Sequence, residues 1–534
     1  MSQRHPEEPE QPAGGSEFTP PLGVELPKPE PRGSAFTRPK TSPQLSHPAF
    51  TPPEGIPVVS LSKEAPWPDR MRTMLRMPLG ERPAPEQPTA QPEAGTGPAV
   101  PRVLDLTLRI GELLLAGGEG AEDVEAAMLG VAHAYGLGRV EPTVTFTLLS
   151  ISYQPSLVDP PATANRTVRR RATDYTRLAA VFRLINDITA ADLTLEDAYR
   201  RLALIRRNRH PYSGWLLTAA AGMLAGAASL LVGGGGPVVF AVAALGAMMG
   251  DRLAWLCAGR GLPEFYQFVA AAMPAAALGV LIARFGHVLP GTSSLQASSV
   301  ITGGLFALIP GRALVAAVQD GLTGFYITAS ARLLEVMYLF TGIVIGVTLI
   351  LYAGVSLGAE LDPDQALRVY ENPPLQLVAA MVLSLAFAVL LQCERGVLAI
   401  AALNGGVAWT VYAALHQESI GIGMSPVAAT AVAAGLVGLF GQMLARYRFA
   451  SALPYVTAAI GPLLPGSATY YGLLGLTRGH LDQGFASLTK AAALALAVAI
   501  GVNLGGEVAR LFLRLPGGAD QARRRAAAKR TRGF

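Results

Sequence analysis

The chain is poor in cysteine and, over much of its length, poor in charge. Only two of its 534 residues are cysteine, Cys257 and Cys393, which excludes a disulfide scaffold and a cysteine-rich metal cluster. Charged residues make up 15% of the chain, against roughly 25% in soluble domains. Residues 1–210 hold 49 of them, residues 211–510 hold 24 and residues 511–534 hold 8. This distribution excludes a single soluble domain and indicates a polytopic membrane protein.

Several functional motifs are also missing. The N-terminus has no basic segment followed by an apolar stretch, so it does not read as a secretory signal peptide. The sequence has no Walker A phosphate loop, which argues against an ATP-driven pump. It shows no nucleophile–His–acid arrangement and no zinc-ligand spacing. We therefore predict no catalytic residue, no metal site and no cofactor.

The first 210 residues divide into two parts. Residues 1–100 contain 22 of the 41 prolines, which predicts a disordered leader, with Met71–Leu79 as part of a tether or, alternatively, a docking helix. Residues 101–210 carry helical and strand patterns that predict a small α+β cytosolic domain. Helices are expected around 103–114, 121–135, 175–188 and 195–207, and strands within 140–153 and 165–171.

Ten apolar segments follow, and most approach the roughly 20 residues needed to cross a bilayer. The fourth and the ninth are shorter and end in Pro-Gly. The ten candidate spans are 214–232, 238–257, 265–285, 297–309, 333–354, 375–392, 396–415, 426–444, 451–464 and 484–504.

The positive charges predict the orientation of these spans. Five arginines within 200–209 precede the first span, which predicts a cytoplasmic N-terminal domain. Most other arginines then fall in loops on the same side, and the acidic loop 358–373 falls on the opposite side. The basic tail 511–534 is interpreted as a contact with anionic lipids rather than with nucleic acid. We expect a multi-pass protein of the plasma (inner) membrane with both termini in the cytoplasm.

Two segments of the apolar region resemble each other. The fourth span ends Leu308-Ile-Pro-Gly311 and the ninth ends Leu463-Leu-Pro-Gly466, an offset of 155 residues. The same offset aligns other glycines downstream. This predicts two membrane repeats of five spans each, at 211–357 and 374–510. An odd number of spans makes the repeats inverted, as in many secondary transporters.

The Pro-Gly pairs are candidate substrate-binding positions. Proline removes a backbone donor and glycine relaxes the backbone, so Pro310-Gly311 and Pro465-Gly466 should break their helices. Freed backbone groups could bind a zwitterion, with Asn404 as a further candidate; the alternative is that each pair simply ends a span. Ionisable residues within spans are candidates for proton coupling. These are Asp320, Glu335, Lys490, Arg332 and Asp251.

Two groups of charges have a simpler interpretation. Asp251 and Arg252 could pair at the membrane interface instead of facing a cavity. Four acidic residues cluster at the start of the second helix, where they complement the helix dipole, and we assign them no function. They are Glu119, Glu122, Asp123 and Glu125.

The sequence resembles the threonine/serine exporter family of bacterial inner membranes. The resemblance covers about residues 103–510 and rests on Leu108–Glu125, Pro142–Thr147 and Leu308–Gly311 with Asp320-Gly321. It implies a cytosolic domain, about ten spans, and export of threonine and serine coupled to the proton motive force. It transfers no binding residue. The second half also departs from the first, because Asp320 aligns with Gly475 and Arg332 with Ser487.

The leading hypothesis is therefore a proton-coupled exporter of small amino acids. Its expected partners are the amino-acid substrate, protons and the lipid bilayer, with no nucleic acid; a homo-oligomer stays open. The alternative is a membrane-anchored enzyme or sensor whose 101–210 domain acts on a cytosolic ligand. A channel is a third hypothesis, since broken helices occur there too.

Overall fold

The structure is a computed structural model of the chain. It describes residues 67–75, 82, 100–155, 158–168, 174–207, 212–232, 236–285, 297–359, 372–416, 422–448, 450–477 and 479–512. Most of the predicted leader, nearly all of the acidic loop and all but the start of the basic tail lie outside the described residues. The described residues belong to one compact unit, Ser60–Pro516.

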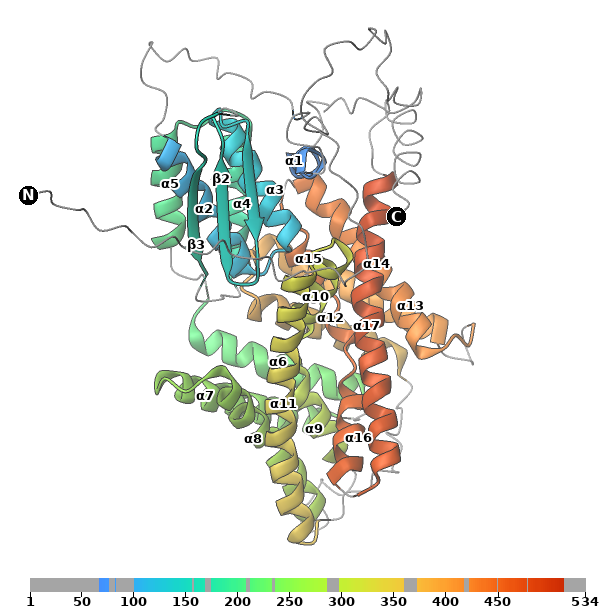
Figure 1. Ribbon diagram of the computed structural model, residues 1–534. Coiled ribbons are helices and arrows are strands. Elements are labelled where there is room, and N and C mark those ends of the chain that lie inside the picture. The colour runs from blue at the N-terminus through green and yellow to red at the C-terminus, as the bar shows by residue number, and fades with distance from the viewer. Residues whose placement is uncertain are drawn as a thin grey trace, which may run out of the picture. The chain divides into compact units, whose positions relative to one another are not determined.

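The part of the chain before the first apolar segment is a helical layer on a small sheet (Figure 1). The antiparallel strands lie in the order β1-β2-β3, and β1 alternates buried and exposed residues, so one face of the sheet is covered. Helices α2 and α3 pack on that face, and the helices and strands lie close to where the sequence predicts them. The elements are α2 (Val100–Gly117), α3 (Ala121–Ala134), β1 (Val140–Val144), β2 (Leu148–Tyr153), β3 (Ala162–Thr167), α4 (Tyr175–Thr189) and α5 (Leu195–Arg207).

One segment departs from the predicted leader. Residues Trp67–Leu75 form helix α1, which packs against α3. Trp67, Met71 and Met74 are buried on one face of it, and the Trp67 ring lies 5.7 Å from that of Phe182. Burial of these large side chains offsets the loss of conformational entropy when this segment becomes ordered as a helix.

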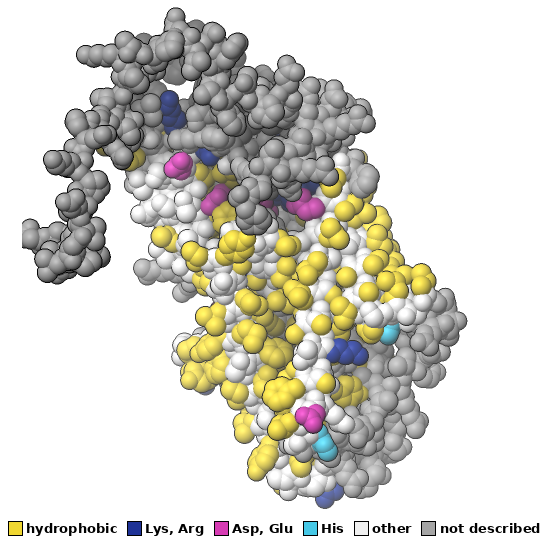
Figure 2. Space-filling view, turned by 45° about the vertical axis from the view of Figure 1, so that its right-hand side comes forward, with side chains coloured by type: hydrophobic (Ala, Val, Ile, Leu, Met, Phe, Trp, Pro, Cys, Tyr) yellow, Lys and Arg dark blue, Asp and Glu magenta, His cyan; other side chains and the backbone are white. Residues whose placement is uncertain are grey.

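Eight helices of the described residues are long and apolar enough to cross a membrane. Large hydrophobic side chains are exposed along them, and Figure 2 shows these side chains covering the surface of the long helices with few charges among them. Such a surface suits lipid contact. The helices are α6 (Gly214–Leu231), α7 (Pro237–Gly259), α8 (Glu264–Phe285), α11 (Tyr326–Ser356), α12 (Pro373–Leu390), α13 (Arg395–His416), α14 (Pro426–Arg448) and α17 (Leu481–Phe512).

The predicted fourth and ninth spans are not continuous helices. The fourth is α9 (Ala297–Phe306), which is followed across Pro310 by α10 (Gly311–Leu322) at a bend of 53°. The ninth is the short α15 (Leu453–Thr457) and the 3-10 helix η2 (Gly461–Leu463), followed by α16 (Gly466–Thr477). The described residues thus hold eight candidate spans, or nine with the bent pair, instead of ten. Prolines 454, 462 and 465 remove three backbone donors from the ninth segment, which accounts for its short helices.

The helices of residues 214–356 and 373–512 make corresponding contacts. Helix α8 packs against α11 as α14 packs against α17, and α10 contacts α17 as α16 contacts α11. Helices α10 and α16 each have 12 residues and begin 155 residues apart, at 311 and 466. Gly346 on α11 lies against the carbonyl of Val269, and Gly501 on α17 lies against that of Ala431, so both pairs of helices approach closely at a glycine.

Candidate functional site

The two Pro-Gly breaks lie in contact with each other. A Cβ on Gly311 would lie 2.8 Å from Cδ2 of Leu464, and a Cβ on Gly466 would overlap the ring of Phe306. Each break therefore packs against the segment that precedes the other. The contact joins segments about 155 residues apart in the chain.

Buried polar atoms without a hydrogen-bond partner among the described residues lie on the helices around these breaks. Asn404 on α13 donates from Nδ2 to the carbonyls of Tyr455 (3.3 Å) and Val437 (3.4 Å), while its Oδ1 has no partner there. The hydroxyls of Ser384 on α12 and Thr302 on α9 are likewise buried and unpartnered. A buried polar atom left without a partner costs about 1–3 kcal/mol, which a polar ligand or water would offset.

Ser384 on α12 packs against Gly405, the residue that follows Asn404 on α13. Gly405 follows Asn404, and a Cβ on Gly405 would overlap the Ser384 hydroxyl and lie 3.5 Å from the carbonyl oxygen of Ala459. The carbonyl belongs to the turn between α15 and η2. The Ser384 hydroxyl and the Ala459 carbonyl thus both lie beside Gly405, the residue that follows Asn404, and α12 and α13 both contact η2, which precedes the second break. Oxygen acceptors of this kind suit an ammonium or hydroxyl group.

A buried ion pair lies at the other end of α10. Asp320 and Arg332 are 0% and 2% exposed, and Arg332 Nη1 lies 3.1 Å from Asp320 Oδ2. The same aspartate accepts the N–H of Ala121 at 2.8 Å through Oδ1. The same arginine donates from Nη2 to the carbonyl of Glu119 at 2.7 Å. Two residues proposed from the sequence are therefore brought together, and both contact the connection between α2 and α3.

We call residues 117–121 the plug loop. Its shape follows from the end of α2: Gly118 has φ +94°, its N–H donates to the carbonyl of Leu115, and the Glu119 N–H donates to that of Leu114. This is the Schellman motif, which needs glycine at the left-handed position. Arg312 at the start of α10 donates to the carbonyl of Gly117 at 3.1 Å. The plug loop is thus held at Gly117, Glu119 and Ala121 by side chains of α10 and α11.

The side chain of Glu119 faces the second half of the chain. It is 4% exposed, and the hydroxyl of Ser451, which lies between α14 and α15, donates to it. Burial, reinforced by the charge of Asp123, raises the pKa of Glu119 to about 8, although the Ser451 hydrogen bond and the charges of Arg72 and Arg332 oppose the rise. A carboxyl group with such a pKa changes its protonation state near neutral pH.

The remaining predicted residues lie apart from these contacts. Asp251 accepts a hydrogen bond from Thr218, and Arg252 donates to the carbonyl of Gly214 at 2.7 Å, so this pair connects α7 to the start of α6. Glu335 is partly buried on α11, and Lys490 is exposed on α17.

Sequence reasoning missed Glu119, Ser451 and Ser384. Glu119 was assigned to the dipole of α3, but it precedes that helix and points across to Ser451. A signal was present, because the acid stands in the run Gly117-Gly-Glu-Gly120, where three glycines permit close approach by a neighbouring segment. Ser384 and Ser451 carry no local signal.

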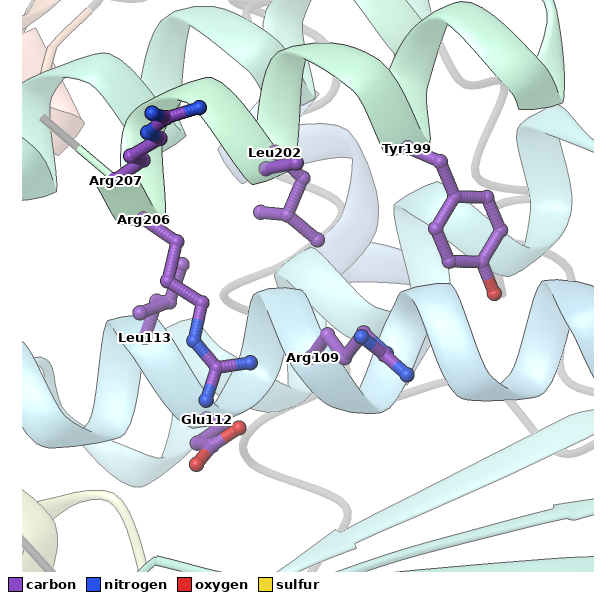
Figure 3. Close-up of a pocket in the computed structure, with 8 residues that line it drawn as sticks. Arg109, Glu112, Leu113, Tyr199, Leu202, Arg206 and Arg207 are labelled. Atoms are coloured by element: carbon purple, nitrogen blue, oxygen red, sulfur yellow. The ribbon is translucent and has the colours of Figure 1, made fainter.

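A separate pocket lies on α2 and α5 (Figure 3). It has a volume of about 300 Å³, and three of its eight lining residues are arginines: Arg109, Arg206 and Arg207. Glu112 also lines it and pairs with Arg166 at 2.5 Å. All lining residues come from α2 and α5, so the breaks and the plug loop contribute none.

These features define a polytopic helical membrane protein with two broken helices in contact, an architecture that occurs in secondary transporters. Two family models match it: "Putative threonine/serine exporter" over residues 105–353 and "Threonine/Serine exporter, ThrE" over residues 376–507. The chain belongs to the threonine/serine exporter family, as the sequence resemblance implied. It is a transporter and not an enzyme.

Two relatives cover most of the chain. A probable threonine/serine exporter of Mycobacterium tuberculosis is 34% identical over 413 residues, 76% of this chain and 76% of its own length. A threonine/serine exporter of Corynebacterium glutamicum is 30% identical over 447 residues, 81% of this chain and 87% of its own. No solved structure matches this chain.

Proposed function

We propose that this chain exports threonine, serine and similar small amino acids across the plasma membrane, and that the proton motive force drives export. The observation that carries the proposal is the contact between the two Pro-Gly breaks, with unpartnered buried oxygens beside it. Family membership supports the substrate class. The binding site lies beside the second break, where Ser384, Asn404 and the carbonyl of Ala459 receive the ammonium and hydroxyl groups of the substrate.

The backbone at the breaks supplies the other half of substrate recognition. The N-terminal ends of α10 and α16 begin at Gly311 and Gly466, directly after the prolines. The first N–H groups of a helix have no partner within it, and the helix dipole favours an anion there. A substrate carboxylate is held at such an end, while its ammonium faces the oxygens around Asn404.

The two halves act as inverted repeats that alternate around this site. The corresponding contacts of α8 with α11 and of α14 with α17, and the equal spacing of α10 and α16, support this arrangement. Both termini face the cytoplasm. The helix ends that carry Arg312, Arg395 and Arg446 lie close to helices α1 to α4: Arg312 donates to Gly117, Arg446 donates to Asp69, and the residues just before Arg395 accept from the start of α4. Proximity to one folded segment supports a common cytoplasmic side for these arginines.

The test is efflux of radiolabelled threonine from loaded cells, with and without an uncoupler, in the presence and absence of the chain. We expect faster efflux with the chain and a loss of that gain with the uncoupler. Equal efflux with and without the chain overturns export, and a gain that survives the uncoupler overturns the coupling.

Variants test the binding site. Loss of one hydrogen bond to the substrate costs about 1–2 kcal/mol, so Ser384→Ala and Asn404→Ala should each raise the KM of efflux roughly 5- to 30-fold. Ser356→Ala is the matched control, because that hydroxyl is exposed near the end of α11 and donates only to the carbonyl of Ala353, at 2.8 Å. An unchanged KM in both site variants argues against this location.

A second candidate function rests on the α2–α5 pocket. Its arginines and Glu112 suit a small anionic or zwitterionic cytosolic ligand, which would make residues 100–207 a sensor. Equilibrium binding of labelled threonine to the full chain distinguishes the cases. Two sites, one lost in Arg109→Ala, support the sensor; a single site lost in Ser384→Ala contradicts it.

A further inference from the structure

We propose that the plug loop is the cytoplasmic gate of the transport path, and that protonated Glu119 holds this gate closed. The proposal rests on the proposed function for the term transport path, while the contacts of the loop stand independently of it. The structure is then the state closed on the cytoplasmic side. Deprotonation of Glu119 releases the loop and opens the path to cytosolic substrate.

Among the described residues 100–207, the plug loop is the one connection between elements that is hydrogen-bonded to both halves of the membrane part. The first half holds its backbone, through Arg312, Asp320 and Arg332. The second half holds its side chain, through the hydroxyl of Ser451. A movement of one half relative to the other must break one of these two sets of bonds. The loop therefore reports, and can restrain, the relative position of the halves.

Glu119 is the weak point of this attachment. Asp320, the carboxylate that accepts the Ala121 N–H of the loop, has Arg332 as an ion-pair partner at 3.1 Å. The arginine donates to the backbone carbonyl of Glu119. An ionised Glu119 would thus be buried with a single hydroxyl donor, and burial of a charge with so little compensation is costly. The raised pKa of Glu119 is consistent with this geometry.

The plug loop has other charged and titratable groups around it. Acids and bases face the loop from several helices. They are Arg72 from α1, Glu122 and Asp123 from α3, Tyr175 from α4, Arg312 and Asp320 from α10 and Arg332 from α11. Asp123 is paired with Arg72 at 2.7 Å, and Arg332 with Asp320. Against the effect of burial, the charge of Arg72 lowers the pKa of Asp123, so Asp123 stays ionised while Glu119 changes its protonation state.

The direction of the pH effect follows from the two pKa values. In the closed state the pKa of Glu119 is about 8, and in a solvated open loop it returns to about 4.5. The closed state binds the proton more tightly, so low pH favours it. Between these values the ratio of closed to open falls about tenfold for each unit of rising pH, and above about pH 8 it levels off.

Thiol accessibility measures this ratio directly. Ala121 is 0% exposed in the closed loop. Ala121→Cys, in the full chain with Cys257→Ser and Cys393→Ala, is labelled in inside-out vesicles by a membrane-impermeant maleimide. At each pH from 6 to 9, the labelling rate of the chain with native Glu119 is divided by that of the Glu119→Gln chain, because this quotient cancels the pH dependence of the thiol. We expect this quotient of labelling rates to rise roughly tenfold per pH unit and to become constant near pH 8, because the open fraction rises in the same way.

Two further variants guard the interpretation. Ser451→Ala removes a bond that favours the ionised carboxyl, so it should move the levelling point to higher pH. Glu196→Gln is the control, since that carboxylate pairs on the surface with Arg102 and both side chains are more than half exposed. A ratio independent of pH, or a levelling point unmoved in Ser451→Ala, overturns the gate. A pH-dependent ratio without threonine efflux leaves the gate standing and overturns the proposed function.

Discussion

Removal of Arg332 should open the plug loop far more often than it opens in the native chain. The guanidinium makes an ion pair with Asp320 and a hydrogen bond to the carbonyl of Glu119, and all three groups are buried. Breaking a buried pair by removing one partner costs roughly 3–5 kcal/mol, because the other charge stays buried without compensation. Arg332→Gln should place this cost on the closed loop, since opening lets water reach Asp320.

The assay is hydrogen exchange at the amide of Ala121, which donates to Asp320 in the closed loop. A change of 1.4 kcal/mol is tenfold, so protection of this amide should fall by roughly 10²- to 10³·⁵-fold in Arg332→Gln. Amides in the middle of α2 should exchange as in the native chain, because the variant leaves that helix intact.

The matched control is Arg183→Gln. Arg183 on α4 pairs with Glu394 before α13 at 2.5 Å, so it also joins residues 100–207 to the membrane part. Its side chain is 59% exposed, and such surface pairs contribute about 0–1 kcal/mol. Protection of Ala121 should change less than about fivefold. Equal protection in the native and Arg332→Gln chains would refute the reasoning that this pair holds the loop.

Three other predictions follow from the packing. Gly466→Leu should reduce threonine efflux at least tenfold at equal expression, because the side chain meets the ring of Phe306; efflux at the native rate contradicts the contact of the breaks. Trp67→Ala removes a buried ring from the contact with Phe182, at a cost of about 3–5 kcal/mol, and should make α1 sensitive to limited proteolysis, which a resistant α1 would contradict. Lys490→Ala should leave the efflux rate within about twofold of native, since this side chain is exposed; a large loss would return Lys490 to the path.

The elements that could be predicted from the sequence are those in which hydrophobic residues recur at one regular spacing. The helical spacing from Val103 to Leu114 and the glycines after it fixed both α2 and its end. The Pro-Gly pairs were found for the same reason, because proline and glycine act on the local backbone whatever surrounds them. Their mutual contact could not be predicted, because it depends on how two distant segments pack. The offset of 155 residues between the two pairs predicts only an internal repeat, which remains a proposal.

The parts that could not be predicted depend on contacts between distant residues. The sequence left Met71–Leu79 open between a tether and a docking helix, and it could not decide because helix α1 is stabilised by burial of Trp67 against Phe182 rather than by its own helical propensity. The pairing of Asp320 with Arg332 could be guessed from their cost in an apolar region. The importance of Glu119 could not, because its partner Ser451 lies 332 residues later in the chain.

The ion pair at the plug loop has no counterpart in the second half of the chain at the offset of 155 residues. In the proposed inverted arrangement, the positions equivalent to Asp320 and Arg332 lie at the opposite side of the membrane, and they are Gly475 and Ser487. A Cβ on Gly475 would lie 2.9 Å from the Cα of Gly484, so α16 and α17 close there backbone against backbone. In that arrangement the external side would close by packing of small residues, whereas the cytoplasmic side would contain the buried ion pair and its two hydrogen bonds to the plug loop. Residues 117–121 give this ion pair one donor and one acceptor, so in the proposed arrangement closure of the cytoplasmic side depends on a third segment as well as on the two halves.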